Sequence, residues 1–184
     1  TAKQFRTQDF IRWTNELKET YRYHRKLWEF CFVAQVLETH GFLREGKTGI
    51  GFGVGTESLP ALFANYGCHI IASDQDFAEA YKQGWTQTEQ YALCKSSLNA
   101  KGICSPEIFD QRVDLRCIDM NNIDAQYDNT ADFIWSCCCF EHLGSIKNGL
   151  AFVMKSLRCL KPGGIAVHTT EFNISSRFHT ISRG

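Results

Sequence analysis

The sequence has no excess of either charge and no hydrophobic run long enough to cross a membrane. Its 184 residues contain 20 lysines and arginines and 20 aspartates and glutamates, so no global basic field favours a nucleic-acid partner. No stretch approaches the roughly 20 consecutive apolar residues of a transmembrane helix. Internal repeats and low-complexity tracts are also absent. This length is typical of a single domain with a sizeable core.

The nine cysteines lack the spacing of a disulfide framework or a zinc site. Their number is odd and no C-x-x-C pair occurs, although both kinds of site usually rely on paired cysteines. Several cysteines lie in apolar runs, where a thiol behaves as a small hydrophobic group. We therefore expect reduced thiols, no metal site and a cytoplasmic protein. The cysteines in apolar runs are Cys31, Cys68, Cys117 and Cys159.

Residues 1–44 are predicted to form a helical preface. Apolar side chains recur at helical spacing from about Asp9 to Thr39, as in amphipathic helices. The segment Tyr21–His24 separates two predicted helices, and Gly41 marks the predicted end of the second.

Apolar runs and helical segments alternate through the rest of the chain. This alternation predicts an α/β fold with a mostly parallel sheet and helices on both faces. Residues 45–184 are therefore predicted to form one domain after the preface. The predicted strands are 48–52, 69–73, 113–118, 133–138 and 165–170, and the predicted helices are 57–66, 88–99 and 149–159, the last ended by Lys161–Gly164.

A glycine-rich turn lies between the first predicted strand and its helix. Gly51, Gly53 and Gly55 form a G-x-G-x-G pattern, and Thr56 stands where a dinucleotide-binding motif has its third glycine. Glycine permits unusual backbone angles and leaves no Cβ in the way of a ligand. A helix that begins near the turn points free N–H groups at the same place. Asp74, at the tip of the second strand, suits hydrogen bonds to ribose hydroxyls.

The G-x-G-x-G spacing resembles motif I of the class I S-adenosylmethionine-dependent methyltransferases. Four later segments resemble that family too, and together the resemblance covers about 46–173. It implies a Rossmann-like fold with S-adenosyl-L-methionine as the cofactor. The later segments are Asp119-Met120, Ser136–Leu143 with its Glu-His pair, Leu157–Gly164, and His168–Asn173.

The resemblance also implies which residues bind the cofactor. The backbone of the glycine turn would line the cofactor, the acid after the second strand would contact the ribose, and the residues after the third strand would contact the adenine. Each assignment has a structural alternative: Asp74 can cap a helix, Asp119 can be a turn residue, and Phe52 can belong only to the core. The predicted set is Gly51, Phe52, Gly53, Gly55, Glu57, Asp74, Gln75, Asp119, Met120, Ser136 and Cys137.

The chain departs from the family pattern in two places. Gly49 stands where the family usually carries an acid for the methionine amino group, so Glu57 or backbone carbonyls near Ser136 would have to supply that contact. The family sheet has seven strands, yet this chain ends at Gly184, shortly after the fifth. We expect truncated C-terminal strands or a reduced fold. The exposed edge of strand five would then pair with a missing C-terminal region or with a second copy.

Glu141 and His142 are the predicted catalytic residues. Methyl transfer mainly requires positioning, but a hydroxyl acceptor also has to lose a proton, and histidine is the usual base near neutral pH. The pair follows strand four, at the edge where open α/β sheets place their ligands. His168 and Glu171 on strand five could converge with it. The structural alternative is that Glu141 and His142 only begin a helix.

Part of the strand-four segment is also similar to small-RNA 2′-O-methyltransferases, which bind a divalent metal through E-x-x-E-H. Cys138 replaces the first glutamate, which leaves too few oxygen ligands for a hard cation. The sequence therefore favours a methyltransferase that acts on a small molecule, such as a sugar or metabolite hydroxyl, over an RNA enzyme. Two other hypotheses are a cofactor-binding subunit without catalysis and a nicotinamide-dependent oxidoreductase. The preface would either shape the acceptor site or only pack on the sheet, and Trp85 would either stack near the ligand or lie on the surface.

Overall fold

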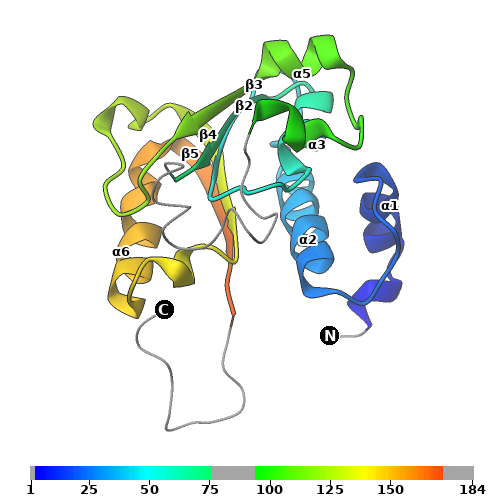
Figure 1. Ribbon diagram of the computed structural model, residues 1–184, viewed down its shortest axis with the longest axis horizontal. Coiled ribbons are helices and arrows are strands. Elements are labelled where there is room, and N and C mark those ends of the chain that lie inside the picture. The colour runs from blue at the N-terminus through cyan, green and yellow to red at the C-terminus, as the bar shows by residue number, and fades with distance from the viewer. Residues whose placement is uncertain (1–2, 76–93, 172–184) are drawn as a thin grey trace, which may run out of the picture.

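The computed structural model describes residues 3–75 and 94–171. Their centre is a five-stranded parallel sheet in the order β3-β2-β1-β4-β5 (Figure 1). This arrangement confirms the predicted Rossmann-like α/β fold. The strands are β1 Thr48–Phe52, β2 His69–Asp74, β3 Val113–Cys117, β4 Ala131–Cys137 and β5 Leu160–Thr169.

Strand β5 begins earlier than its sequence predicts. A strand from Ile165 is expected, because Lys161–Gly164 contains proline and two glycines. Instead, pairing with β4 starts at Leu160, opposite Ala131, and the register shifts before Ile165 pairs with Phe133. The strand accommodates the Pro-Gly-Gly sequence at this irregularity, as β-bulges commonly do.

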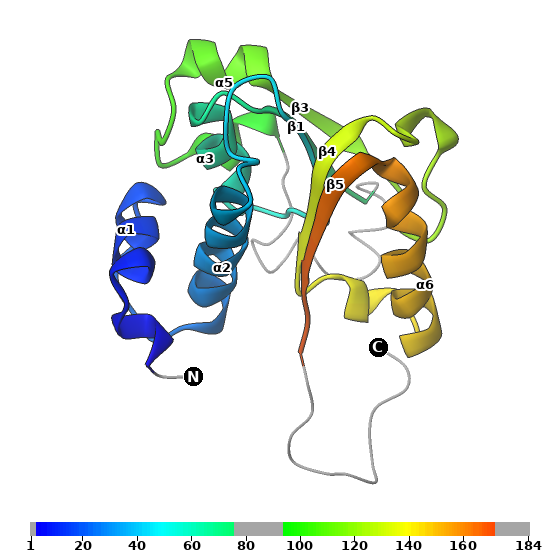
Figure 2. The ribbon, with the colours of Figure 1, turned by 180° about the vertical axis from the view of Figure 1, so that it is seen from behind.

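The helices lie on both faces of the sheet, as predicted. Figures 1 and 2 show α6 on one side and α1, α2, α3 and α5 on the other. Thr7 caps α1 and Ser145 caps α6 through side-chain acceptors, which satisfy amides that a helix start leaves unpaired. The helices are α1 Gln8–Glu16, α2 Arg25–Thr39, α3 Leu59–Asn65, α5 Pro106–Arg112 and α6 Ile146–Ser156, with short 3-10 turns at Gln4–Arg6, Lys95–Asn99, Ala125–Tyr127, Phe140–His142 and Leu157–Cys159.

The preface and α3 lie near their predicted positions, whereas α6 starts at Ile146, three residues before its predicted start, and α5 is absent from the predicted helices. The preface forms two helices separated around 17–24, and α2 is followed by Gly41 with φ +74°. Helix α3 starts two residues later than predicted, with Pro60 in its first turn, where proline is favoured. Of the predicted helix 88–99, only 94–99 lies within the described residues, where Lys95–Asn99 forms a 3-10 turn. Trp85 lies outside them.

Strand β4 separates two hydrophobic cores. Phe133 and Trp135 point toward the larger core, which contains α1, α2 and α3. Ile134, between them in sequence, points toward the smaller core, where Phe152 of α6 packs. This alternation follows from the period of two in a strand.

The preface is joined to the main domain by buried contacts. Trp13 of α1 is fully buried in the larger core, and its indole N–H donates to Gln35 of α2 at 2.8 Å. The Tyr66 hydroxyl donates to Glu16 at 2.7 Å. Helix α2 in turn contacts β4 and β5. The preface therefore shares one core with the sheet.

Gly49 is enclosed by an aromatic ring. A Cβ at this position would lie 2.3 Å from Cε2 of Phe133. We expect Gly49→Ala to lower the free energy of unfolding by about 1–3 kcal/mol, because overpacking forces rings and backbone to shift. Denaturant unfolding would measure this loss. The penalty should shrink in a Phe133→Leu background, and an equal penalty there would contradict the steric explanation.

The two outer strands of the described sheet are β3 and β5, each with a single neighbour among residues 3–75 and 94–171. The expectation that another segment or chain covers β5 stays a prediction. Within the same residues, no helix combines the length and apolar character that crossing a bilayer requires.

Candidate cofactor-binding site

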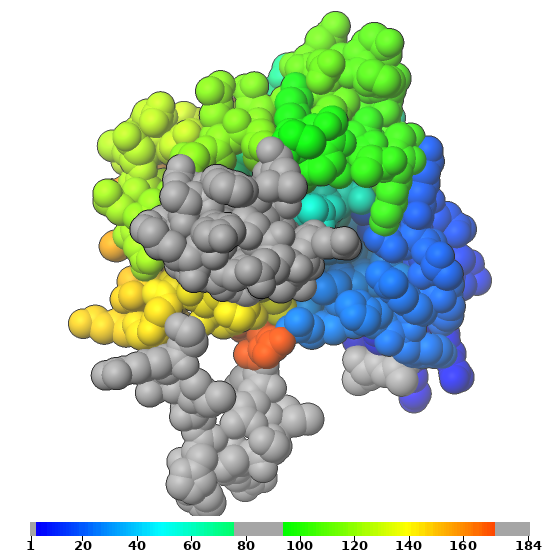
Figure 3. Space-filling view, in the orientation of Figure 1, coloured from blue at the N-terminus to red at the C-terminus, as the bar shows by residue number. Residues whose placement is uncertain are grey.

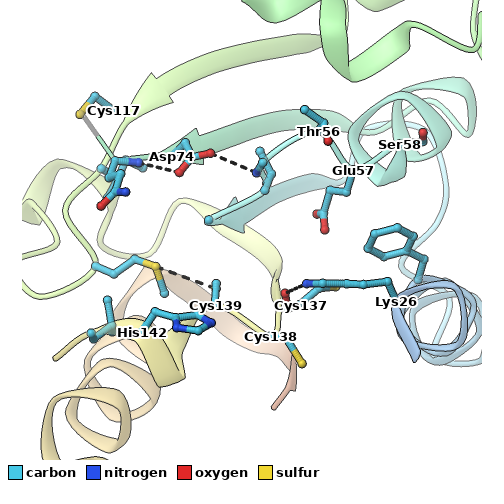
Figure 4. A pocket seen from close by; sticks show the side chains of 18 of the residues that line it. Lys26, Thr56, Glu57, Ser58, Asp74, Cys117, Cys137, Cys138, Cys139 and His142 are labelled. Atoms are coloured by element: carbon cyan, nitrogen blue, oxygen red, sulfur yellow. Dashed lines mark hydrogen bonds between the residues drawn. The ribbon is translucent and has the colours of Figure 1, made fainter. Parts of the chain in front are cut away.

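A cavity of about 1190 Å³ opens at the carboxyl ends of the strands, where ligands bind in open α/β sheets. Its walls come from three parts of the fold: the glycine turn with the tip of β2, the segments that follow β3 and β4, and the preface (Figure 4). The lining residues from the sheet side are Gly53–Ser58, Asp74, Gln75, Cys117–Asn121, Cys137–Cys139 and His142–Gly144, and those from the preface side are Glu19, Arg22, Lys26 and Phe30, with Lys101 beside them.

The glycine turn forms the cavity floor in a conformation that requires glycine. Gly53 and Gly55 have φ values of +59° and +50°, a region that other residues rarely adopt. A Cβ on Gly53 would also lie 2.9 Å from the Cβ of Cys139. The amide of Val54 donates to the Ser73 carbonyl at 3.0 Å, which ties the turn to β2. The backbone is thus open to a ligand that lies against it.

Asp74 is held beside this turn by two backbone amides. Its Oδ2 accepts from the Gly55 N–H at 3.1 Å, and its Oδ1 accepts from the Gln75 N–H at 2.8 Å. These two bonds fix the orientation of the carboxylate at the edge of the cavity. The predicted ribose contact is compatible with this geometry.

Asp119 and Met120 line the cavity after β3. Asp119 is exposed and its Oδ1 accepts from the Asn121 N–H at 2.8 Å, so the residue is also the turn residue that its alternative interpretation predicts. The Met120 side chain is buried, and its Sδ lies 4.0 Å from the Cys139 Sγ. Together they offer one acceptor and one apolar surface, which suits a purine ring.

Glu57 is a buried carboxyl group on the cavity wall. Its Oε1 accepts from the Trp135 indole N–H at 2.6 Å. Burial raises the pKa of Glu57 to about 8, although the Trp135 hydrogen bond and the charge of Lys26 oppose this rise. Figure 4 shows this carboxyl group directed into the cavity.

Comparison with known proteins now identifies the fold family. A family model of the methyltransferase domain matches residues 50–168, more than half of the chain. The chain belongs to this methyltransferase family. S-adenosyl-L-methionine is therefore its cofactor. A search of curated proteins found no match.

Solved structures of methyltransferases have the same fold. The phosphoethanolamine N-methyltransferase 2 of Haemonchus contortus, solved with S-adenosyl-L-methionine, superimposes with a TM-score of 0.53 at 16% identity, over 92% of this chain and 35% of its own. A Galdieria sulphuraria protein provisionally described as a sarcosine dimethylglycine methyltransferase superimposes with a TM-score of 0.51 at 20% identity. The match covers 74% of this chain and 43% of that protein. At such identities the similarity shows the fold alone.

A cyclase shares this fold as well. The (4+2)-cyclase SpnF has a TM-score of 0.53 at 17% identity, over 86% of this chain and 56% of its own. This methyltransferase domain thus spans about a third to just over half of the three solved chains. The cyclase also illustrates that the fold does not fix the reaction.

The cavity of this methyltransferase domain fits its cofactor. The left-handed glycines leave open backbone on the floor, and the oriented Asp74 carboxylate provides acceptors for hydroxyl groups. A buried carboxyl at Glu57 offers a partner for a cation. The predicted residues on the lining are Gly53, Gly55, Glu57, Asp74, Gln75, Asp119, Met120, Cys137 and His142.

Four predicted residues lie away from the lining and contact other groups. Phe52 packs on Phe152 with ring centroids 5.2 Å apart, and its carbonyl accepts from the Cys139 thiol at 3.3 Å. Glu141 accepts a hydrogen bond from the Thr170 hydroxyl at 3.3 Å. Gly51 lies within β1, where Trp135 would obstruct a Cβ. The fourth is Ser136, which is fully buried.

The polar groups of β4 and β5 have separate partners. The Ser136 hydroxyl and His168 Nδ1 are 2.7 Å apart on the α6 side of the sheet. Burial lowers the pKa of His168 to about 4. Glu171 pairs instead with Arg25 of α2, and His142 is exposed on the cavity wall. The predicted convergence of Glu141, His142, His168 and Glu171 is therefore wrong, and of these four residues His142 is the one on the cavity lining.

Cys138, which stands in place of a metal-binding glutamate, points toward α2. Its thiol donates to Glu29 at 3.1 Å, and the same carboxylate accepts from the Thr169 hydroxyl at 3.1 Å. The described residues contain no group of three or more histidine, cysteine, aspartate or glutamate side chains suited to a metal ion.

The preface residues on the lining carry no motif that sequence reasoning recognises. Glu19 and Arg22 lie in the connection between α1 and α2, and Lys26 and Phe30 lie on α2. Helix α2 also meets the end of β5: in Figure 3, that end (orange) lies between the surface of α2 (blue) and that of the segment after β4 (yellow). The preface thus both packs on the sheet and shapes the cavity.

Proposed function

We propose that this chain transfers a methyl group from S-adenosyl-L-methionine to a small-molecule acceptor, at a hydroxyl of a sugar or another metabolite. The observation that carries the proposal is the cavity in which the glycine turn, the anchored Asp74 and the exposed His142 meet. The cofactor supplies, when bound, a methyl group already activated by its sulfonium. What remains for the protein is to orient the acceptor, exclude water and receive a proton.

The residues for these tasks come from different walls. His142 presents an exposed imidazole to the cavity, and histidine accepts protons effectively near neutral pH. Arg22 and Lys101 also line the cavity, and both pair with the Glu19 carboxylate. They suit an acceptor with polar or anionic substituents. The nine free cysteines support a reducing compartment such as the cytoplasm.

Formation of S-adenosylhomocysteine in the presence of candidate acceptors would test this function. We expect turnover with some sugars or other hydroxyl-bearing metabolites, and we expect Asp74→Ala to lower it strongly at limiting cofactor concentration. Binding of the cofactor without turnover on any acceptor would instead favour a cofactor-binding subunit.

A further inference from the structure

The structure shows an ammonium group already bound at the carboxyl end of β4. Lys26 of α2 reaches into the cavity, and its Nζ donates to the Cys137 carbonyl at 2.7 Å. The same Nζ lies 4.0 Å from Glu29, which is almost fully buried. A backbone carbonyl at the end of a central strand, close to a buried carboxylate, is thus a built cation subsite in this chain.

Glu57 forms the second wall of this subsite. Figure 4 shows its carboxyl group directed toward the hydrogen bond between Lys26 and Cys137. The Trp135 indole fixes the orientation of this carboxyl group. Its surroundings are Trp135 and Cys137 from β4, and Lys26 and Glu29 from α2. Among these groups, Lys26 alone carries a positive charge.

The position at which the family usually carries an acid for the methionine amino group has no room for a side chain in this protein. Gly49 lies two residues before the glycine motif, and a Cβ there would collide with the Phe133 ring at 2.3 Å. With Phe133 in place, a carboxylate cannot extend from that position. A carboxylate for a cationic ligand group has to come from another element, and Glu57 is the buried acid on the lining.

We propose that the Cys137 carbonyl and Glu57 bind the α-ammonium group of the cofactor's methionine end, and that Lys26 leaves this subsite to pair with the adjoining carboxylate. Lys26 then fills the subsite only in the free protein. The assignment deepens the proposed function and rests on its cofactor. In the complex the ammonium group lies beside the ionised Glu57, so this buried carboxylate is not left unpaired.

Three nucleosides distinguish the ammonium contact with Glu57 from the carboxylate contact with Lys26. S-adenosylhomocysteine carries both the amine and the carboxylate, its decarboxylated analogue keeps only the amine, and 5′-methylthioadenosine has neither. Glu57→Gln should weaken the first two by about tenfold or more, since a charge-assisted bond is lost, and should leave 5′-methylthioadenosine unchanged. The glutamine carbonyl can still accept from Trp135, which preserves the packing. Calorimetry of the purified chain would measure all three.

Lys26 gives the complementary pattern. Lys26→Met should weaken S-adenosylhomocysteine by about tenfold, while the decarboxylated analogue should bind at least as tightly as to the wild type. The methionine variant keeps most of the aliphatic stem. Lys101→Met is the matched control, because Lys101 lines the same cavity but pairs with Glu19, and it should show neither change.

Proton release offers a readout that does not depend on turnover. Because the pKa of Glu57 is about 8 in the free protein, the carboxyl is mostly protonated at pH 7 and must ionise to hold an ammonium group. Binding of S-adenosylhomocysteine at pH 7 should therefore release about one proton to the buffer. As the pH is raised toward 8, the affinity for S-adenosylhomocysteine should increase by about tenfold for each pH unit. Glu57→Gln should lose the release, and 5′-methylthioadenosine should show none.

Two results would overturn the assignment alone: unchanged S-adenosylhomocysteine binding in Glu57→Gln, or an equal loss of 5′-methylthioadenosine in that variant. Equal losses of the decarboxylated analogue and S-adenosylhomocysteine in Lys26→Met would contradict the exchange. Failure of the folded wild type to bind any of the three nucleosides would overturn the cofactor site itself, and the assignment with it.

Discussion

We expect Asp74→Ala to weaken binding of S-adenosylhomocysteine by about 100-fold. The carboxylate lies at the tip of β2, where amides of Gly55 and Gln75 orient it toward the cavity. A hydrogen bond to a charged group contributes about 1.5–3 kcal/mol, so the loss of ribose contacts together with a loosened turn corresponds to about 3 kcal/mol. Calorimetric titration of the variant against the wild type would measure this loss.

Asp119→Ala is the matched control for that variant. Asp119 is an exposed carboxylate on the same cavity, and it contacts a neighbouring turn amide rather than the glycine turn. Its removal should weaken binding by tenfold or less, because an exposed contact exchanges readily with water. Thermal unfolding without ligand would show whether either variant is destabilised. Wild-type affinity in a folded Asp74→Ala protein would contradict the ribose assignment.

The sheet and the glycine turn could be predicted because their signals are local. Strand β1 has the bounds that its apolar run predicts, and the left-handed glycines coincide with the G-x-G-x-G spacing. Asp74 follows from the length of one helix and one strand. Such features depend on residues that are close in the sequence, so residue type and the spacing of apolar residues and glycines are sufficient to find them.

The rest of the cavity depends on tertiary packing. Lys26 and Cys137 are 111 residues apart in sequence, and no local pattern indicates that a lysine of α2 reaches the end of β4. The predicted grouping of His168 with His142 fails for a related reason. In the sheet register, His168 pairs with Ser136, which places its side chain on the α6 face. Only the register between strands decides which face a residue occupies.

His142 is the residue on which we expect chemistry with a hydroxyl acceptor to depend most. His142→Gln should lower kcat by about 10²–10⁴-fold, the usual contribution of a positioned general base. Affinity for S-adenosylhomocysteine should stay near that of the wild type, because the glycine turn and Asp74 are untouched. Single-turnover methyl transfer, measured beside calorimetric binding, would separate the two effects.

Acceptor acidity distinguishes a base from a residue that only shapes the cavity. A more acidic hydroxyl needs less help to lose its proton, so the defect of His142→Gln should shrink from an alkyl alcohol to a phenol of similar size. A purely steric role would give the same defect with both acceptors. Glu141→Gln is the internal control, because that side chain lies off the cavity lining and contacts Thr170. It should leave kcat within a few-fold of the wild type, and a loss as large as that of His142→Gln would show that the two residues act together.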